Sequence, residues 1–136
     1  MSEILDGEYL LEVMGLTTYF DITEGIVARP IARVHAVEGV TFGIRPGETL
    51  SLVGESGCGK TTTGRTIIGL EKATSGEIRF EGKPVTLQSA DERRTFCQKV
   101  QMIFQDPYSS LNPRMSIAET LSEPMRVHKI AADREE

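Results

Sequence analysis

Apolar residues fall into short runs along the chain, and these runs predict β-strands. Residues 9–16 form an apolar run between two glycines, and residues 34–44 begin to alternate between apolar and polar positions, as in a half-buried strand. Residues 49–53 and 100–104 form two further short runs. Residues 21–33 contain a glycine and a proline as structure breakers, so they predict a loop or insertion between the first two strands.

Turn residues and a change of period divide the middle of the chain. A Pro-Gly pair within residues 45–48 predicts a turn, because proline presets φ and glycine tolerates a positive φ. After Lys60 the apolar residues follow a helical period, and this helix is expected to end near residues 69–74. A strand over residues 77–80 and a turn over residues 81–84 follow.

Two helix starts are marked by capping boxes, in which a serine is followed three residues later by a glutamate. The two pairs are Ser89 with Glu92, and Ser116 with Glu119. The first predicts a short helix over residues 90–97. The second predicts a helix that Pro124 interrupts, because proline lacks the N–H group that a helix interior needs.

A phosphate-binding pattern follows the run at residues 49–53. It matches Gly-x-x-x-x-Gly-Lys-Ser/Thr at every fixed position, over Gly54, Glu55, Ser56, Gly57, Cys58, Gly59, Lys60 and Thr61. Glycines in such a loop let the backbone adopt positive φ, so that successive N–H groups point at one anion. The helix that follows presents its N-terminal N–H groups and its positive dipole end to the same anion.

The charged and hydroxyl residues of this pattern complete a nucleotide site. Lys60 supplies positive charge at the β- and γ-phosphates, and Thr61 supplies a hydroxyl to Mg²⁺. A chance match occurs in roughly one chain in 200 of this length, and the strand before and helix after this one make it rarer. The phosphate-binding pattern already explains the position of Cys58, so thiol catalysis is not expected. The pattern therefore predicts binding of ATP, or a similar nucleotide, with Mg²⁺.

Charge and composition limit the other functions. The chain has 136 residues and a formal net charge of −5, which argues against nucleic acid as a partner. No apolar run approaches the ~18 residues that span a bilayer, and the acidic N-terminus lacks the basic start of a secretory signal. Cys58 and Cys97 are too few for a disulfide framework and are expected to be free thiols in a reducing cytosol.

Two segments resemble those of ABC-transporter ATPases. Residues 45–53 (RPGETLSLV) resemble the strand that leads into the phosphate loop of that family, and residues 101–115 (QMIFQDPYSSLNPRM) resemble its Q-loop. Together with residues 54–65, the sequences of these segments are similar to the oligopeptide/dipeptide-permease subgroup, and closest to the second of that importer's two ATPase subunits. The resemblance covers nearly the whole chain. It implies an ATPase that drives peptide import from the cytoplasmic face of the membrane.

The resemblance assigns further residues. In the family the Q-loop glutamine, here Gln105, reaches Mg²⁺ and the attacking water, and an aromatic after the first strand stacks on adenine. Phe20 fits that spacing best, with Tyr19 as the alternative, and either is otherwise a core aromatic. Thr62 is expected to contact the α-phosphate. The implied partners are transmembrane permease subunits, facing residues 108–114, and a second ATPase subunit as dimer partner.

Several family motifs do not occur in this sequence. It contains no LSGGQ-like signature, no Walker B strand with its Asp-Glu pair, and no switch histidine in the expected context. The run before Asp106 superficially resembles a Walker B strand, which leaves an unrelated kinase or GTPase as one alternative. A nucleotide-binding fragment without turnover is another. The chain therefore resembles the N-terminal portion of an ABC ATPase, and alone it is expected to be inactive in hydrolysis.

The expected architecture is α/β, a P-loop core joined to an antiparallel β-subdomain and truncated in the helical subdomain. We expect the P-loop core and antiparallel β-subdomain to occupy residues 1–107. Residues 108–136 would then form the exit of the Q-loop and the incomplete start of the helical subdomain.

Overall fold

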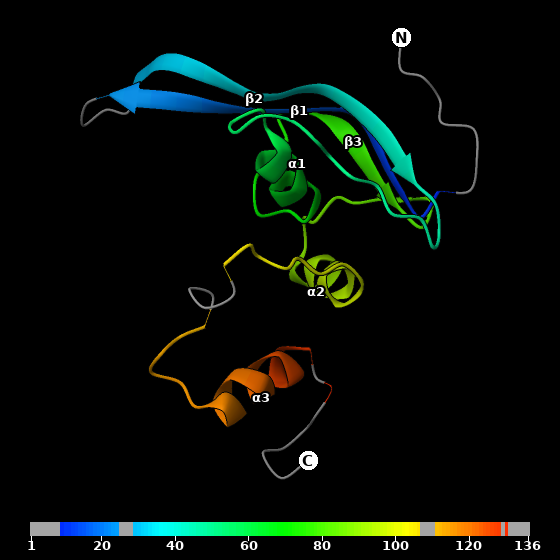
Figure 1. Cartoon of the computed structure of the whole chain (residues 1–136), viewed down its shortest axis with the longest axis vertical. Helices are drawn as coiled ribbons and strands as arrows, with labels where there is room; N and C mark the ends of the chain where they lie inside the picture. Colours follow the sequence, from blue (N-terminus) through cyan, green and yellow to red (C-terminus); the bar gives the residue numbers. More distant parts are fainter. Residues whose placement is uncertain (1–8, 25–28, 107–110, 129, 131–136) are drawn as a thin grey trace. The chain divides into compact units, whose positions relative to one another are not determined.

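A computed structural model describes residues 9–24, 29–106, 111–128 and 130 of the chain (Figure 1). The chain divides into two compact units, Met1–Leu87 and Gln88–Glu136.

The first unit is built on a four-stranded antiparallel sheet with the strand order β2-β1-β3-β4 (Figure 1). Its strands are β1 (Leu11–Glu24), β2 (Arg29–Ile44), β3 (Ser75–Phe80) and β4 (Lys83–Pro84). One helix, α1 (Lys60–Ile67), lies against β1 and β2. The strands predicted over residues 34–44 and 77–80 are confirmed, and the strand predicted at 9–16 begins at Leu11 and continues well beyond its predicted end.

The loop predicted over residues 21–33 is wrong for the part of this segment that the structure describes, because β1 extends to Glu24, β2 begins at Arg29 and the two strands pair there. Asp21 and Arg33 are cross-strand partners, and the Arg33 Nε lies 2.6 Å from the Asp21 Oδ1. The hydrogen bond from Arg33 lowers the pKa of the Asp21 carboxyl. Pro30 is tolerated because β2 is an edge strand of the sheet. Gly25, the other predicted breaker, lies outside the described residues.

The strands predicted over residues 49–53 and 100–104 are also wrong. Both segments have strand-like sequences, but neither pairs with a strand among the described residues. A strand needs a neighbour for its backbone hydrogen bonds, and local sequence does not supply one. Val53 is 92% exposed and Ile103 is 93% exposed. The turn predicted just before the first segment is confirmed: the Glu48 N–H donates to the Arg45 carbonyl at 3.1 Å.

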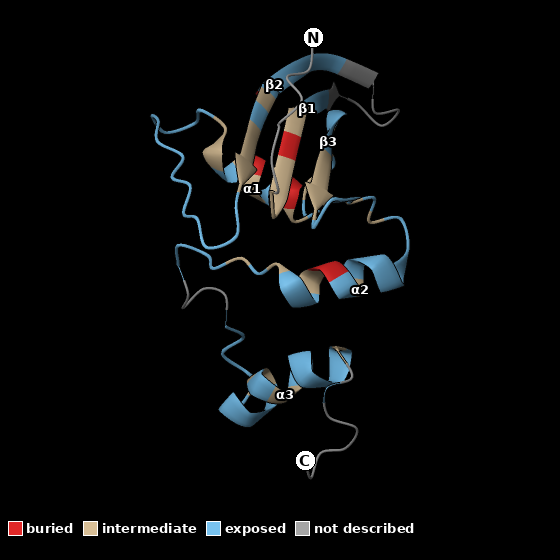
Figure 2. Cartoon of the chain, turned by 90° about the vertical axis from the view of Figure 1, so that its right-hand side faces the viewer, coloured by how far each residue is buried: buried red, intermediate tan, exposed pale blue. Residues whose placement is uncertain are grey.

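A small core holds α1 against the sheet. Val13 and Leu16 of β1 are fully buried, and Ile67 of α1 packs with them at 8% exposure (Figure 2). Partly buried apolar side chains surround this cluster, among them Phe42 and Ile78. The core therefore holds α1, the helix that follows residues 54–59, against β1.

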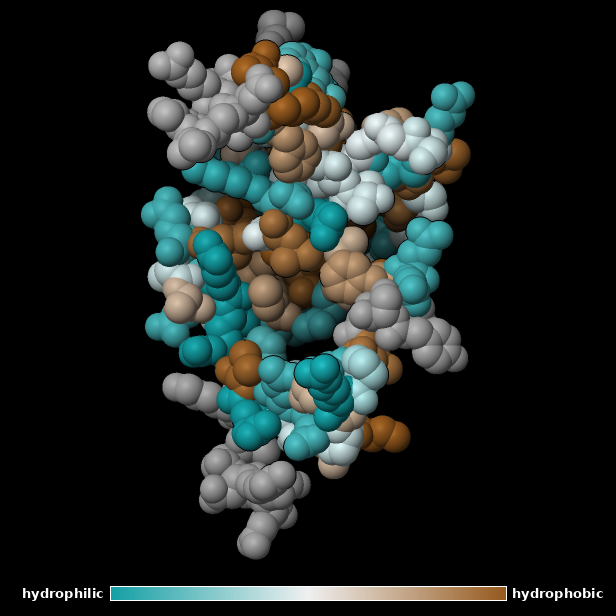
Figure 3. Space-filling model, turned by 90° about the vertical axis from the view of Figure 1, so that its left-hand side faces the viewer, coloured by the Kyte–Doolittle hydropathy of each residue, from teal (hydrophilic) through white to brown (hydrophobic). Residues whose placement is uncertain are grey.

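The end of β1 and the start of β2 are less buried than this core. Ile22, Ile31 and Val34 are between 46% and 60% exposed. Figure 3 views the side of the chain that carries this end, and hydrophobic side chains reach the surface there.

The second unit contains two helices with the predicted capping boxes. In α2 (Ala90–Lys99) Ser89 and Glu92 cap each other's backbone N–H groups, and in α3 (Ile117–Val127) Ser116 and Glu119 do the same. Hydrogen bonds from Ser116 hold the pKa of Glu119 below its usual value.

The predicted interruption at Pro124 is wrong, because α3 continues to Val127. Proline removes one N–H group from the helix. Its own carbonyl still accepts the His128 N–H at 2.9 Å, which supports the last turn.

Candidate phosphate-binding site

The loop over residues 54–59 leads directly into α1 and has the backbone that its glycines predict. Gly57 and Gly59 have φ values of 83° and 93°, in the left-handed region that favours glycine. The Cys58 N–H faces the Glu55 carbonyl at 3.4 Å, which closes a tight turn. The loop therefore curves back on itself immediately before the first turn of the helix.

Gly59 also lies where no side chain fits. A Cβ atom at this position would collide with the carbonyl oxygen of Ala36 and would lie 3.5 Å from Cγ2 of Val37. Both neighbours belong to β2, so the end of the loop packs against the sheet. At the other end of the loop, a Cβ on Gly54 would lie 2.6 Å from the Cys58 Sγ. Backbone packing therefore requires glycine at Gly59, whereas at Gly54 the crowding comes from the Cys58 side chain.

Lys60 lies across this loop. Its ammonium donates to the carbonyl oxygens of Gly54 at 2.8 Å and Glu55 at 2.7 Å, and it lies 3.4 Å from the Cys58 Sγ. These contacts hold a positive charge beside the backbone of the loop. An ammonium in this position attracts an anion that enters the loop.

The N-terminus of α1 is built to face an anion. Its N-cap is Gly59, which has no side chain to bond the first N–H groups, and its first turn contains no acidic residue. Those N–H groups have no acceptor within the helix, and the helix dipole adds positive potential. The fold thus places oriented donors, a dipole and the Lys60 ammonium together. This arrangement fits a polyphosphate.

The hydroxyls that follow Lys60 differ in exposure. Thr61 is exposed and Thr62 is half-buried, whereas Thr63 is buried and donates to the Gly59 carbonyl at 2.9 Å. An exposed hydroxyl oxygen beside bound phosphate is a suitable ligand for a hard cation such as Mg²⁺. Among the residues that the structure describes, no cluster of His, Cys, Asp and Glu side chains offers another metal site.

The two aromatic candidates lie on opposite faces of β1, because successive side chains of a strand alternate. The Tyr19 ring stacks on the His35 ring with 4.0 Å between centroids, and its hydroxyl donates to Glu38 at 3.1 Å. Phe20 is 38% exposed and shares the face of Thr18, which contacts α1. Phe20 is therefore on the side of the sheet that carries the phosphate loop, and Tyr19 is engaged on the other side.

Gln105 lies in the second unit and is exposed. Its contacts with Mg²⁺ and the attacking water therefore stay a prediction. Of the segment from Tyr108 to Arg114, residues 108–110 lie outside the described part of the chain, and residues 111–114 are exposed.

Sequence reasoning missed a pair of buried threonines behind the loop. The Oγ1 atoms of Thr18 on β1 and Thr66 on α1 lie 3.1 Å apart. The two residues are 48 positions apart in the sequence, and threonine in a strand or a helix is unremarkable by itself. Only the packing of α1 on β1 reveals the contact.

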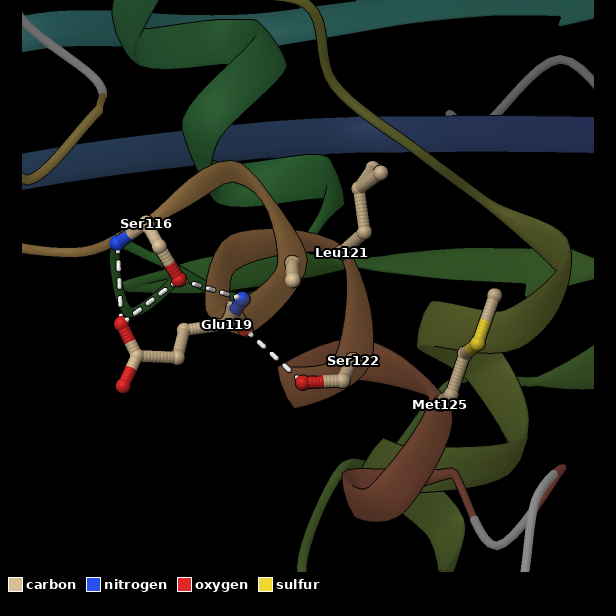
Figure 4. Close-up of a pocket in the computed structure, with 6 residues that line it drawn as sticks. Ser116, Glu119, Leu121, Ser122 and Met125 are labelled. Carbon is tan, nitrogen blue, oxygen red and sulfur yellow. Dashed lines mark hydrogen bonds between the residues drawn. The ribbon is translucent and has the colours of Figure 1, made fainter. Parts of the chain in front are cut away.

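A hollow of about 380 Å³ lies on α3 (Figure 4). It is lined by Ser116, Ala118, Glu119, Leu121, Ser122 and Met125. The Glu119 carboxylate points back at Ser116, where it accepts from the backbone N–H at 2.9 Å and from the hydroxyl at 2.8 Å. The carboxylate and hydroxyl that line this hollow thus cap α3. The candidate functional site is therefore the phosphate loop and not this hollow.

Comparison with known proteins agrees with this geometry. The family model described as "ABC transporter" matches residues 37–135. The chain belongs to the ABC transporter family. The glutathione import ATP-binding protein GsiA of Escherichia coli O157:H7 is 46% identical over 132 residues, which is 97% of this chain and 21% of that relative. This ABC-family chain therefore spans about a fifth of the length of the curated relatives it matches.

Solved structures show the same fold. One is the dimeric ATP-binding cassette MJ0796 bound to ADP and Pi, with a TM-score of 0.71 and 24% identity over 90% of this chain and 50% of that one. Another is cbiO1 of Clostridium perfringens, part of the ABC transporter complex cbiONQ, with a TM-score of 0.60 and 28% identity over 78% of this chain and 38% of that one. The predicted ABC ATPase fold is confirmed. No helix within the described ranges has the length and apolar character to cross a membrane.

Proposed function

We propose that this chain binds ATP with Mg²⁺ as part of an ABC importer ATPase that drives peptide uptake. The observation that carries the proposal is the loop at residues 54–59, in which glycine geometry, the N-terminus of α1 and the Lys60 ammonium converge. The importer assignment is supported by the 46% identity to a glutathione import protein, because glutathione is itself a small peptide. We assign the P-loop core and β-subdomain to residues 1–107, and the start of the helical subdomain to 108–136.

The residues of the loop take separate roles in this proposal. The backbone over residues 54–59 surrounds the β-phosphate, and Lys60 neutralises charge on the β- and γ-phosphates. Thr61 ligates Mg²⁺, and Thr62 contacts the α-phosphate. Phe20 stacks on adenine. The exposure of Phe20 on the α1 side of the sheet supports this choice over Tyr19, whose ring already stacks on His35.

In the complete ATPase we assign hydrolysis to water attacking the γ-phosphorus, with ADP leaving. Lys60 stabilises the developing negative charge. Gln105 positions the water and contacts Mg²⁺ through its amide oxygen, which is a suitable acceptor and ligand. When bound, Mg²⁺ neutralises the phosphate oxygens. The family match favours this reaction over the unrelated kinase or GTPase considered from the sequence.

Partners follow from the same proposal. We place the chain at the cytoplasmic face of the membrane. Residues 108–114 contact transmembrane permease subunits, and a second ATPase subunit completes each nucleotide site. Labelled di- and tripeptide uptake tests the import function: cells carrying Lys60→Ala in this gene are expected to lose it, while uptake of free amino acids serves as the control. Unchanged peptide uptake would exclude peptides as the cargo.

The 136 residues alone are expected to bind ATP without turning it over. They include neither an Asp-Glu pair after a Walker B strand nor a signature that acts on a partner's ATP. Phosphate release by the purified chain should therefore stay at the level of Lys60→Ala. A Lys60-dependent kcat within the ordinary range of about 1–10³ s⁻¹ would contradict this expectation.

Alkylation of Cys58 is expected to block ATP binding, and ATP is expected to protect this thiol. Cys58 is exposed and its Sγ lies 3.4 Å from the Lys60 ammonium, so a group attached there occupies the phosphate loop. Cys97, outside the loop, is the internal reference. Mass spectrometry of both thiols with and without ATP·Mg²⁺ measures the effect. Equal protection of Cys58 and Cys97, or none at either, would disprove the geometry.

A further inference from the structure

Buried hydroxyls lie on both β1 and α1, beside the small apolar core. Thr18, Thr63 and Thr66 are each at most 4% exposed, beside a fully buried apolar pair on β1. A buried hydroxyl is costly unless it is hydrogen-bonded. Each of these three hydroxyls has a partner, and the contact between Thr18 and Thr66 joins β1 to α1.

The direction of the hydrogen bonds follows from counting hydrogens. The Thr66 hydroxyl donates to the Thr62 carbonyl oxygen at 2.8 Å, and a carbonyl oxygen only accepts. A hydroxyl has one hydrogen, so Thr66 has none left for Thr18. In the 3.1 Å contact between the two Oγ1 atoms, Thr18 must therefore be the donor. The result is a directed relay from Thr18 to Thr66 to the Thr62 carbonyl.

This relay joins the two structures that a nucleotide must contact. Its first member lies two residues before Phe20 on the same face of β1. Its last member is the backbone of Thr62, in the first turn of α1, which begins at Lys60. Thr18 also pairs with Val37, and the neighbouring Ala36 carbonyl lies against Gly59. The hairpin and the phosphate-binding helix are thus joined by a backbone contact at one point and by the hydroxyl relay at another.

We propose that Thr18 and Thr66 are positioning residues that hold the aromatic-bearing strand in register with the phosphate-binding helix. An apolar pair resists separation but permits small slides and rotations, whereas a hydrogen bond between two short, branched side chains restricts both distance and direction. The relay lets one ATP contact Phe20 and the phosphate loop together. This inference rests on the proposed nucleotide binding. It adds that the relay affects the affinity for the base and leaves the affinity for the phosphates nearly unchanged.

The test compares ATP·Mg²⁺ with inorganic triphosphate·Mg²⁺, which has phosphates but no base, by calorimetry on the full chain. Thr18→Val removes the donor and keeps the branched shape. It is expected to weaken ATP binding roughly 3- to 10-fold, the scale of one hydrogen bond, while triphosphate binding changes less than about 2-fold. Thr66→Val should do the same, and the double variant should be no worse than either single one, because all three lack the same relay.

Two further variants separate positioning from folding. Thr18→Ser retains the hydroxyl and is expected to keep the wild-type ratio of ATP to triphosphate affinity. Thr17→Val removes a neighbouring buried hydroxyl whose partners are Gly15 and Gly39 rather than α1. It should lower thermal stability without changing that ratio. The Thr17 variant thus measures the effect of losing a buried hydroxyl while the relay stays intact.

The outcomes are distinguishable. If wild-type chain binds ATP and triphosphate but Thr18→Val and Thr66→Val leave the ratio unchanged, or shift it no more than Thr17→Val does, the relay is overturned and the proposed function stands. The same holds if Thr18→Ser behaves like Thr18→Val. If wild-type chain binds neither ligand, the proposed function fails and this inference fails with it.

Discussion

Replacing Lys60 by alanine is expected to weaken ATP·Mg²⁺ binding by roughly 100-fold, because its ammonium supplies the positive charge beside the loop. The substitution removes the ammonium that faces the loop, and with it two charge-assisted hydrogen bonds to the Gly54 and Glu55 carbonyls at 2.8 and 2.7 Å. The loop then has no ammonium to attract phosphate, and its backbone has lost two hydrogen bonds. Calorimetry with ATP·Mg²⁺ measures the loss.

A matched variant separates this local effect from a general loss of charge. Lys72 is exposed and lies in the same unit, outside the loop and α1. Lys72→Ala changes the net charge equally and is expected to keep wild-type affinity, because a single exposed charge at that position is screened by solvent and salt. If Lys60→Ala and Lys72→Ala bind ATP equally well, the phosphate loop is not the nucleotide site.

Features that depend on neighbours along the chain could be predicted from the sequence. Both capping boxes are local exchanges between a serine and a glutamate three residues later, and both form as expected at Ser89 and Ser116. The glycines of the phosphate loop adopt the positive φ that the pattern requires. In each case the physical cause lies within a few residues, so the sequence carries it.

Features that depend on a distant partner could not be predicted in this way. Residues 49–53 have the apolar sequence of a buried strand, yet a strand exists only where another backbone accepts its hydrogen bonds. The pairing of residues 21–24 with residues 29–33 was missed for the opposite reason. The breakers in this segment argue for a loop, but Asp21 pairs with Arg33 across the two strands, next to the stacked rings of Tyr19 and His35.

The site divides along the same line. The octet at residues 54–61 predicts the phosphate end of the proposed site from local sequence, whereas preferring Phe20 to Tyr19 requires knowing which face of β1 meets α1. Thr18 and Thr66 make this plain, because their 3.1 Å contact defines that face. The choice therefore comes from packing and not from spacing.

Gly59→Ala is expected to abolish ATP binding and to destabilise the first unit more than any other single glycine substitution in the loop. Two separate costs combine at this residue. Its φ of 93° is strained for any residue with a side chain, and the added methyl group would collide with the Ala36 carbonyl of β2. Because Gly59 immediately precedes Lys60, a shift that relieves the collision moves the ammonium and the helix N-terminus together.

Two other glycines separate the costs. Gly47 and Gly57 have φ values of 75° and 83°, and nothing lies within 4 Å of a Cβ built on either. Gly47→Ala, outside the loop, should lower the free energy of unfolding by about 1 kcal/mol through backbone strain and leave ATP affinity unchanged. Gly57→Ala should cost a similar amount and weaken binding, because it distorts the loop itself. Gly59→Ala should cost a further 1–3 kcal/mol or so from overpacking against the sheet. Denaturant unfolding and calorimetry on the three variants measure both quantities, and equal destabilisation by all three would show that the loop does not rest on β2 at Ala36.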